Sequence, residues 1–162
     1  MTVTTPRPAA PRHQMFLDEV VTRLTQWLAK HSIDLLRVSL GVVFLGFGVL
    51  KFFPGASPAE ALVARTIDTL SLGIVSGRAA VLLTAVAECV IGITLISGKF
   101  LRAGLLVLAA SLVGIMSPLV LFYGDMFPGT PTLEAQYVFK DIVLATGGMV
   151  VAARALGARL VQ

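Results

Sequence analysis

The chain has 162 residues, of which 56% are hydrophobic and 14% are charged, whereas an ordinary soluble domain has about 25% charged residues. This composition excludes a soluble globular protein and favours a chain whose main solvent is lipid. Four membrane spans of about 20 residues each would leave no room for a separate soluble catalytic domain. The sequence therefore predicts an all-α membrane protein.

The cysteine and histidine content excludes several kinds of redox centre. The single cysteine, Cys89, cannot form an intramolecular disulfide, and both histidines, His13 and His31, precede the first expected span. Thiol–disulfide exchange and bis-histidine haem ligation therefore do not fit this chain. The sequence also has no metal-ligand spacing, P-loop or dinucleotide-binding glycine motif. We expect no metal, no cofactor and no intrinsic catalytic activity.

The N-terminal residues divide into two segments. Residues 1–13 contain three prolines and few apolar side chains, which predicts a disordered tail. In residues 14–32, apolar side chains recur at helical spacing from Phe16 to Leu28, with polar side chains on the opposite face. This pattern predicts an amphipathic helix lying along the membrane interface. The alternative is that its apolar face docks another protein.

Residues 33–158 are predicted to form a domain of four transmembrane helices, with spans at 33–53, 79–97, 102–123 and 137–156. The third span is the clearest, because no charged residue lies between Arg102 and Asp125. Ser117-Pro118 predicts a kink in it, where Ser117 or a neighbouring helix can satisfy the carbonyl that proline leaves free. Glycines in all four spans predict close contacts between helices. They are Gly41, Gly46, Gly48, Gly92, Gly114, Gly147 and Gly148.

The loop between the first two spans is predicted to contain a short helix. Ser57-Pro58-Ala59-Glu60 matches a capping box with proline at the first helical position. Apolar residues follow at helical spacing as far as Leu70, and Gly73 can end the helix.

The distribution of lysine and arginine predicts a topology with both termini in the cytoplasm. In that orientation nine cations lie on the cytoplasmic side and four on the other side, as the positive-inside rule requires. The four are Lys51, Arg65, Arg78 and Lys140. The cations therefore indicate topology and not a nucleic-acid site. We also expect no cleaved signal peptide, so that the first span stays as an anchor.

Charged side chains within the expected spans form the candidate binding site. Glu88 is the middle residue of the second span, and a charge at that depth costs about 2.5–3.5 kcal/mol on insertion scales. Its candidate partners are Lys51 and Lys140. Because Lys140 and Asp141 are adjacent, they point about 100° apart on a helix, and we expect one of them to face Glu88 or Lys51.

Arg37 completes the candidate cluster at the other end of the first span, where it can pair locally with Asp34. Two interpretations of the cluster stay open. It is a buried network of ion pairs that fixes the register of the helices, or a polar cavity that binds a solute, a quinone or a proton.

Four segments of the sequence resemble the DoxX-like superfamily of membrane proteins. They are LRVSLGVVFLGFGVLKFFPG (36–55), AECVIGITLISG (87–98), SPLV (117–120) and FKDIVL (139–144). They look closest to the YkgB branch, which includes the reactive-chlorine-resistance inner-membrane protein. The outer loop is shorter than in that branch.

This resemblance implies a four-helix bundle in the bacterial inner membrane. Members of the superfamily are linked to a thiosulfate:quinone oxidoreductase, to complexes that join superoxide dismutase and a sulfurtransferase, or to oxidant resistance. The matching polar positions are Arg37, Lys51, Glu88, Lys140 and Asp141.

Two functions remain open. The first is a non-catalytic accessory subunit or scaffold of an oxidant-stress or quinone-linked redox assembly, whose partners are the lipid bilayer and a redox subunit or quinone. The alternative is a small transporter or channel, formed by a homo-oligomer, that moves a solute or protons through a cavity around Glu88.

Overall fold

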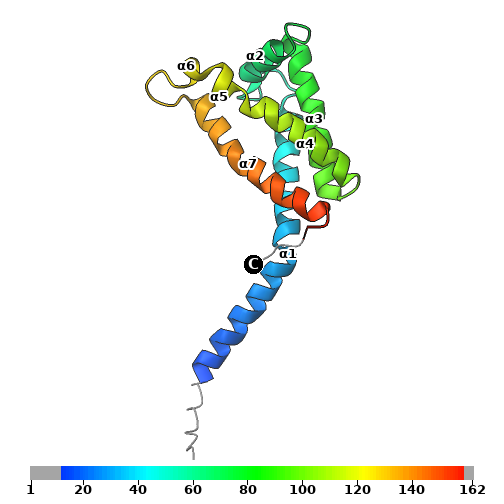
Figure 1. Cartoon of the computed structure of the whole chain (residues 1–162), viewed down its shortest axis with the longest axis vertical. Coiled ribbons are helices and arrows are strands. Elements are labelled where there is room, and N and C mark those ends of the chain that lie inside the picture. Colours follow the sequence, from blue (N-terminus) through cyan, green and yellow to red (C-terminus); the bar gives the residue numbers. More distant parts are fainter. Residues whose placement is uncertain (1–11, 159–162) are drawn as a thin grey trace, which may run out of the picture. The chain divides into compact units, whose positions relative to one another are not determined.

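The computed structural model describes residues 12–158, and every regular element in that range is a helix. The helices are α1 (Arg12–Leu50), α2 (Glu60–Leu70), α3 (Gly77–Ser97), α4 (Leu101–Met116), α5 (Pro118–Leu121), α6 (Tyr123–Met126) and α7 (Leu133–Ala155). The chain divides into two compact units, residues 1–32 and 33–162, and α1 runs through the boundary between them (Figure 1). The predicted disordered tail, residues 1–13, lies outside the described residues except for its last two, which belong to α1.

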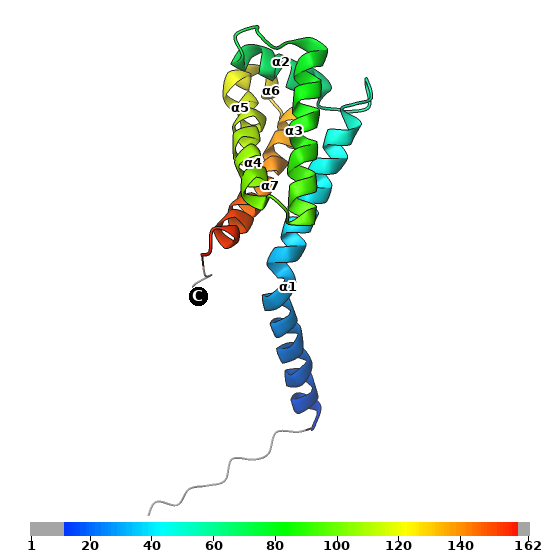
Figure 2. The same ribbon diagram turned by 90° about the vertical axis from the view of Figure 1, so that its right-hand side faces the viewer.

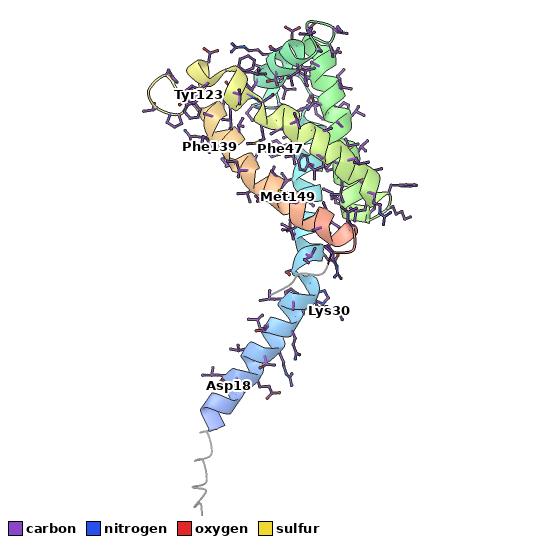
Figure 3. The ribbon with its side chains drawn as sticks, viewed as in Figure 1. Asp18, Lys30, Phe47, Tyr123, Phe139 and Met149 are labelled. Atoms are coloured by element: carbon purple, nitrogen blue, oxygen red, sulfur yellow. The ribbon has the colours of Figure 1, made fainter. Side chains whose placement is uncertain are left out.

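The first unit contains the N-terminal part of α1, in which residues 16–30 are all exposed. All seven apolar side chains of the predicted stripe are between 46% and 66% exposed. They are Phe16, Leu17, Val20, Val21, Leu24, Trp27 and Leu28. On the polar face Arg23 forms an ion pair of 2.7 Å with Glu19, and Figure 3 shows Asp18 and Lys30 on the same stretch of helix. The helix continues past Ser32 without interruption, so the segments predicted as 14–32 and 33–53 belong to one α-helix.

In the second unit, four helices share one apolar core. Helices α1, α3, α4 and α7 all contribute fully buried side chains to it, and the views in Figures 1 and 2 agree that α3 and α4 run side by side. The core residues are Leu40, Phe44, Ile91, Leu95, Leu108 and Val151. A second, smaller cluster joins α5 and α6 to the start of α7 through Phe122, Met126, Ala135 and Val138.

Three helical stretches are long and apolar enough to cross a membrane: Phe16–Leu50 within α1, Gly77–Ser97, and Leu101–Leu121, which combines α4 and α5. Their number and composition support a membrane location. Helix α7 is 23 residues long but is not among the three, because it carries Lys140 and Asp141 in its first half and Arg154 near its end. The fourth span therefore stays a prediction.

The third predicted span is interrupted at Ser117, as the following proline requires. Helix α4 ends at Met116 and α5 begins at Pro118. Pro118 has no N–H to donate to the carbonyl of Gly114, and the Ser117 hydroxyl donates to that carbonyl instead, at 2.8 Å. The prediction that Ser117 satisfies the freed carbonyl is therefore confirmed.

The predicted capping box is wrong. Helix α2 begins at Glu60, its N-cap is Ala59, and no side chain caps it. Ser57 is buried instead, and its Oγ has no hydrogen-bond partner among the described residues. The carboxylate of Glu60 does not reach back to Ser57, because it accepts from the Gly55 N–H at 2.7 Å and from Arg78 at 3.1 Å.

Candidate functional site

Lys51 and Glu88 form a buried ion pair between the end of α1 and the middle of α3. The Lys51 Nζ lies 2.7 Å from Glu88 Oε2 and 2.9 Å from Oε1. Lys51 is 2% exposed and Glu88 is 6% exposed. The ammonium also lies 3.5 Å from the Phe47 carbonyl oxygen and 5.8 Å from the centre of the Phe47 ring. Both oxygens of the carboxylate are therefore engaged by one cation.

The sequence of α3 explains why Glu88 points inward. The buried residues Val81, Ala85, Glu88, Gly92 and Leu95 follow one another at spacings of four and three, which is the period of one face of an α-helix. Glu88 thus lies on the same buried face as the apolar residues of the core.

Glycines bring α1 close enough for Lys51 to reach Glu88. A Cβ atom at Gly92 would lie 2.6 Å from Leu45 Cβ and 2.8 Å from the Gly41 carbonyl oxygen. A Cβ atom at Gly48 would lie 3.0 Å from the backbone nitrogen of Cys89. Real Cβ atoms essentially never lie closer than 3.0 Å to a backbone atom, so the contact between α1 and α3 requires a glycine at Gly92. A side chain at Gly48 would require the two helices to shift slightly. Gly46, by contrast, faces open space.

Of the two adjacent charges on α7, Asp141 is the more buried. Asp141 is half-buried and forms no ion pair with another described residue. Lys140 is exposed, and its Nζ lies 4.3 Å from the centre of the Tyr137 ring. The structure thus pairs Lys51 with Glu88 and leaves Lys140 outside that pair.

Arg37 does not belong to this cluster. Its guanidinium donates to the carbonyl oxygens of Leu95 and Ile96 at the end of α3, and its Nε lies 3.7 Å from Asp34 Oδ1. Fourteen residues of chain separate it from Lys51, which is about 21 Å along a helix. The grouping of Arg37 with Glu88 is therefore corrected, whereas its pairing with Asp34 was predicted.

Two arginines outside the predicted site form ion pairs between neighbouring segments of the chain. Arg78, at the start of α3, donates to the Phe52 carbonyl at 2.7 Å and pairs with Glu60 of α2 at 3.1 Å. Arg65 of α2 pairs with Asp125 at 2.7 Å, and its guanidinium lies 3.9 Å from the centre of the Phe122 ring. The sequence indicates these contacts only in that cations and carboxylates both occur in the segments between the expected spans.

The Lys51 ammonium and the Glu88 carboxylate are groups that carry charge and can exchange a proton. Among the described residues no group of three or more His, Cys, Asp or Glu side chains could hold a metal ion. The free thiol of Cys89 adjoins Glu88 in sequence and has no second cysteine to react with.

These features define an all-helical membrane protein with one buried ion pair between two of its helices. The family model described as DoxX matches residues 32–124, more than half of the chain. The chain belongs to the DoxX family. The match includes Lys51 and Glu88 but ends before α7, so Lys140 and Asp141 lie beyond it. No curated protein and no solved structure matches the chain.

Proposed function

We propose that this chain is a non-catalytic accessory subunit or scaffold of a redox assembly in the bacterial inner membrane, acting in oxidant stress or linked to quinone. The observation that carries the proposal is the exposed apolar stripe from Phe16 to Leu28 on α1. Seven large apolar side chains on one helical face are more than an isolated surface helix leaves uncovered. The redox context rests on the resemblance of the sequence to the YkgB branch.

The ion pair supports a scaffold better than a catalyst. Lys51 and Glu88 satisfy each other and are nearly inaccessible, whereas a catalytic acid or base must reach a substrate. The stripe precedes the expected first span in the chain, and the two belong to one continuous apolar stretch of helix, Phe16–Leu50. We propose that the stripe is a docking face for a redox partner.

The test is purification of the full chain from its native membrane in mild detergent, with mass spectrometry of the proteins and quinones that accompany it. We expect a redox subunit to co-purify with the unmodified chain. The variant Leu24→Asp/Trp27→Asp should lose that subunit but stay in the membrane, because its spans are intact. The matched variant Thr22→Asp/Gln26→Asp adds the same two charges to the polar face and should keep the subunit.

A chain that purifies alone and still restores oxidant resistance in a deletion strain would contradict the accessory role. Equal loss of the partner from both variants would show that charge on this helix matters and the apolar stripe does not. That result would also contradict the proposal.

A second candidate function is transport of a proton or small solute by an oligomer. Its support is the buried Lys51–Glu88 pair together with the half-buried Asp141 of α7, because ionisable groups within a membrane are typical of proton pathways. Flux into liposomes that contain only this chain, lost on Glu88→Gln, would favour transport over the accessory role.

A further inference from the structure

A group of cations lies at the end of the helical bundle opposite to the Lys51–Glu88 pair. Lys99 is in the connection between α3 and α4, Arg102 is in the first turn of α4, and Arg154 is in the last turn of α7. All three side chains are exposed, and none forms an ion pair with another described residue. We call these residues the basic group.

The cations at the other end of the bundle differ in whether they form ion pairs. Lys51, Arg65 and Arg78 each pair with a carboxylate. Of the described cations at that end only Lys140 lacks a carboxylate partner, and its ammonium lies over the Tyr137 ring. All three members of the basic group lack one, which leaves their positive charge available to an external anion.

An apolar hollow adjoins the basic group. It is lined by Phe100, Leu101, Arg102, Ala103 and Ala155, and so lies between the beginning of α4 and the end of α7, which both views place close together (Figures 1 and 2). Phe100 has a φ of 53° and is 83% exposed. A positive φ is uncommon for an aromatic residue, and here it accompanies a ring that contacts little of the protein.

The basic group and the adjoining apolar hollow together favour a ligand that has both an anionic part and an apolar part. A soluble anion would use the cations but not the apolar hollow, and an uncharged lipid would use the hollow but not the cations. Basic pockets between transmembrane helices bind the headgroups of anionic phospholipids. The ends of α3, α4 and α7 also lie where a membrane-spanning helix meets the headgroup layer.

We propose that the basic group and the adjoining hollow form a binding site for an anionic phospholipid. Lys99, Arg102 and Arg154 contact its phosphate groups, and the hollow lined by Leu101, Ala103 and Ala155 receives the upper part of an acyl chain. A diphosphatidylglycerol carries two phosphates and several acyl chains, and so offers more than one anionic group to the three cations. The site is independent of the redox role proposed above.

The test is native mass spectrometry of the full chain in detergent, titrated with tetraoleoyl diphosphatidylglycerol or with dioleoyl phosphatidylcholine. We expect one preferred diphosphatidylglycerol per chain and weaker binding of phosphatidylcholine. The variant Arg102→Gln/Arg154→Gln should weaken binding about fivefold for each cation removed. Arg102→Lys/Arg154→Lys should keep most of the affinity, because the charge stays.

Two further variants distinguish a specific lipid site from non-specific attraction between an anionic lipid and the cations of the protein. Arg65→Gln/Lys140→Gln removes the same charge at the other end of the bundle and should leave the affinity unchanged. Ala103→Phe fills the hollow with every cation in place and should weaken binding. The melting temperature and gel-filtration profile of each variant check that it folds.

The proposal is overturned if both double glutamine variants lose affinity equally, or if Ala103→Phe binds as the unmodified chain does. Equal binding of phosphatidylcholine would show that charge plays no part. Displacement of the lipid by millimolar inorganic phosphate would show that the cations bind a free anion, which would also overturn a lipid site.

Discussion

Lys51 neutralises both carboxylate oxygens of Glu88 where neither side chain reaches water. Within a membrane an unpaired charge is costly, so each residue requires the other. Replacing both members of a buried pair is nonetheless often neutral, and such pairs are therefore weak indicators of stability. The other carboxylate of the candidate site, Asp141, is half-buried and forms no ion pair with a described residue.

We predict that Glu88→Gln lowers the free energy of unfolding by about 3–5 kcal/mol, because it leaves Lys51 buried without a counter-ion. Lys51→Met should cost a similar amount by leaving Glu88 alone. The double variant Lys51→Met/Glu88→Gln should lose much less than the sum of the two. Asp141→Asn, which removes a half-buried charge outside the pair, should cost less than about 1 kcal/mol. The free energy of unfolding of the four variants is measured in mixed detergent micelles.

Survival of hypochlorite by a deletion strain carrying these variants separates structure from function. If the pair only fixes helix register, the double variant recovers survival together with stability. Recovered stability without survival would show that the charges themselves act, and would favour transport through this cluster.

At the scale of the helices, the sequence predicted which segments are helical better than where they end. The expected spans 79–97 and 137–156 correspond to Gly77–Ser97 and Leu133–Ala155, because long apolar runs have few alternatives in a membrane. The start of α2 was mispredicted because Glu60 has a tertiary partner, Arg78, which a local capping pattern cannot reveal.

The candidate site was predictable in its members but not in its pairing. A charge in the middle of an apolar run identifies Glu88 from sequence alone. The choice of Lys51 over Lys140 depends on the rotation of α7 about its axis and on the approach of α1 to α3. The approach of α1 to α3 depends on Gly41, Gly48 and Gly92, and a glycine predicts a close contact without indicating which helix it faces. Arg37 was misassigned because its partners are backbone carbonyls of α3.

We predict that Gly92→Ala separates α1 from α3 and lowers stability by about 1–3 kcal/mol, the usual cost of overpacking. Its Cβ would meet backbone atoms of α1 at 2.7 and 2.8 Å, which no rotamer change relieves. Gly46→Ala is the matched control, since nothing lies within 4 Å of its Cβ, and it should be neutral or stabilise the helix by up to about 1 kcal/mol. Thermal unfolding in detergent compares them, and equal effects would show that α1 and α3 are not in close contact at Gly92.

At the scale of the whole molecule, we predict that α7 crosses the membrane. The apolar core requires α7 beside α1, α3 and α4, and its 23 residues would extend about 35 Å as a helix, enough for a hydrocarbon layer of about 30 Å. Its charges lower its hydropathy, but Asp141 is half-buried and Lys140 is exposed in the first half of the helix, where a lysine can reach the headgroups. We therefore expect four spans and both termini on the cytoplasmic side, as the excess of nine cations over four favours.

Single cysteines at four exposed positions test this topology in a Cys89→Ser background. We predict that cysteines at Ala56 and Thr130 react with an impermeant maleimide in intact cells, and that cysteines at Lys99 and Ala158 react only after permeabilisation. All four positions are exposed, so a lack of labelling reports the membrane side and not burial. If Ala158 labels together with Thr130, α7 does not cross the membrane and the chain has three spans. If Ala56 and Lys99 label on the same side, α3 itself fails to cross, and the buried position of Glu88 would no longer imply an intramembrane charge.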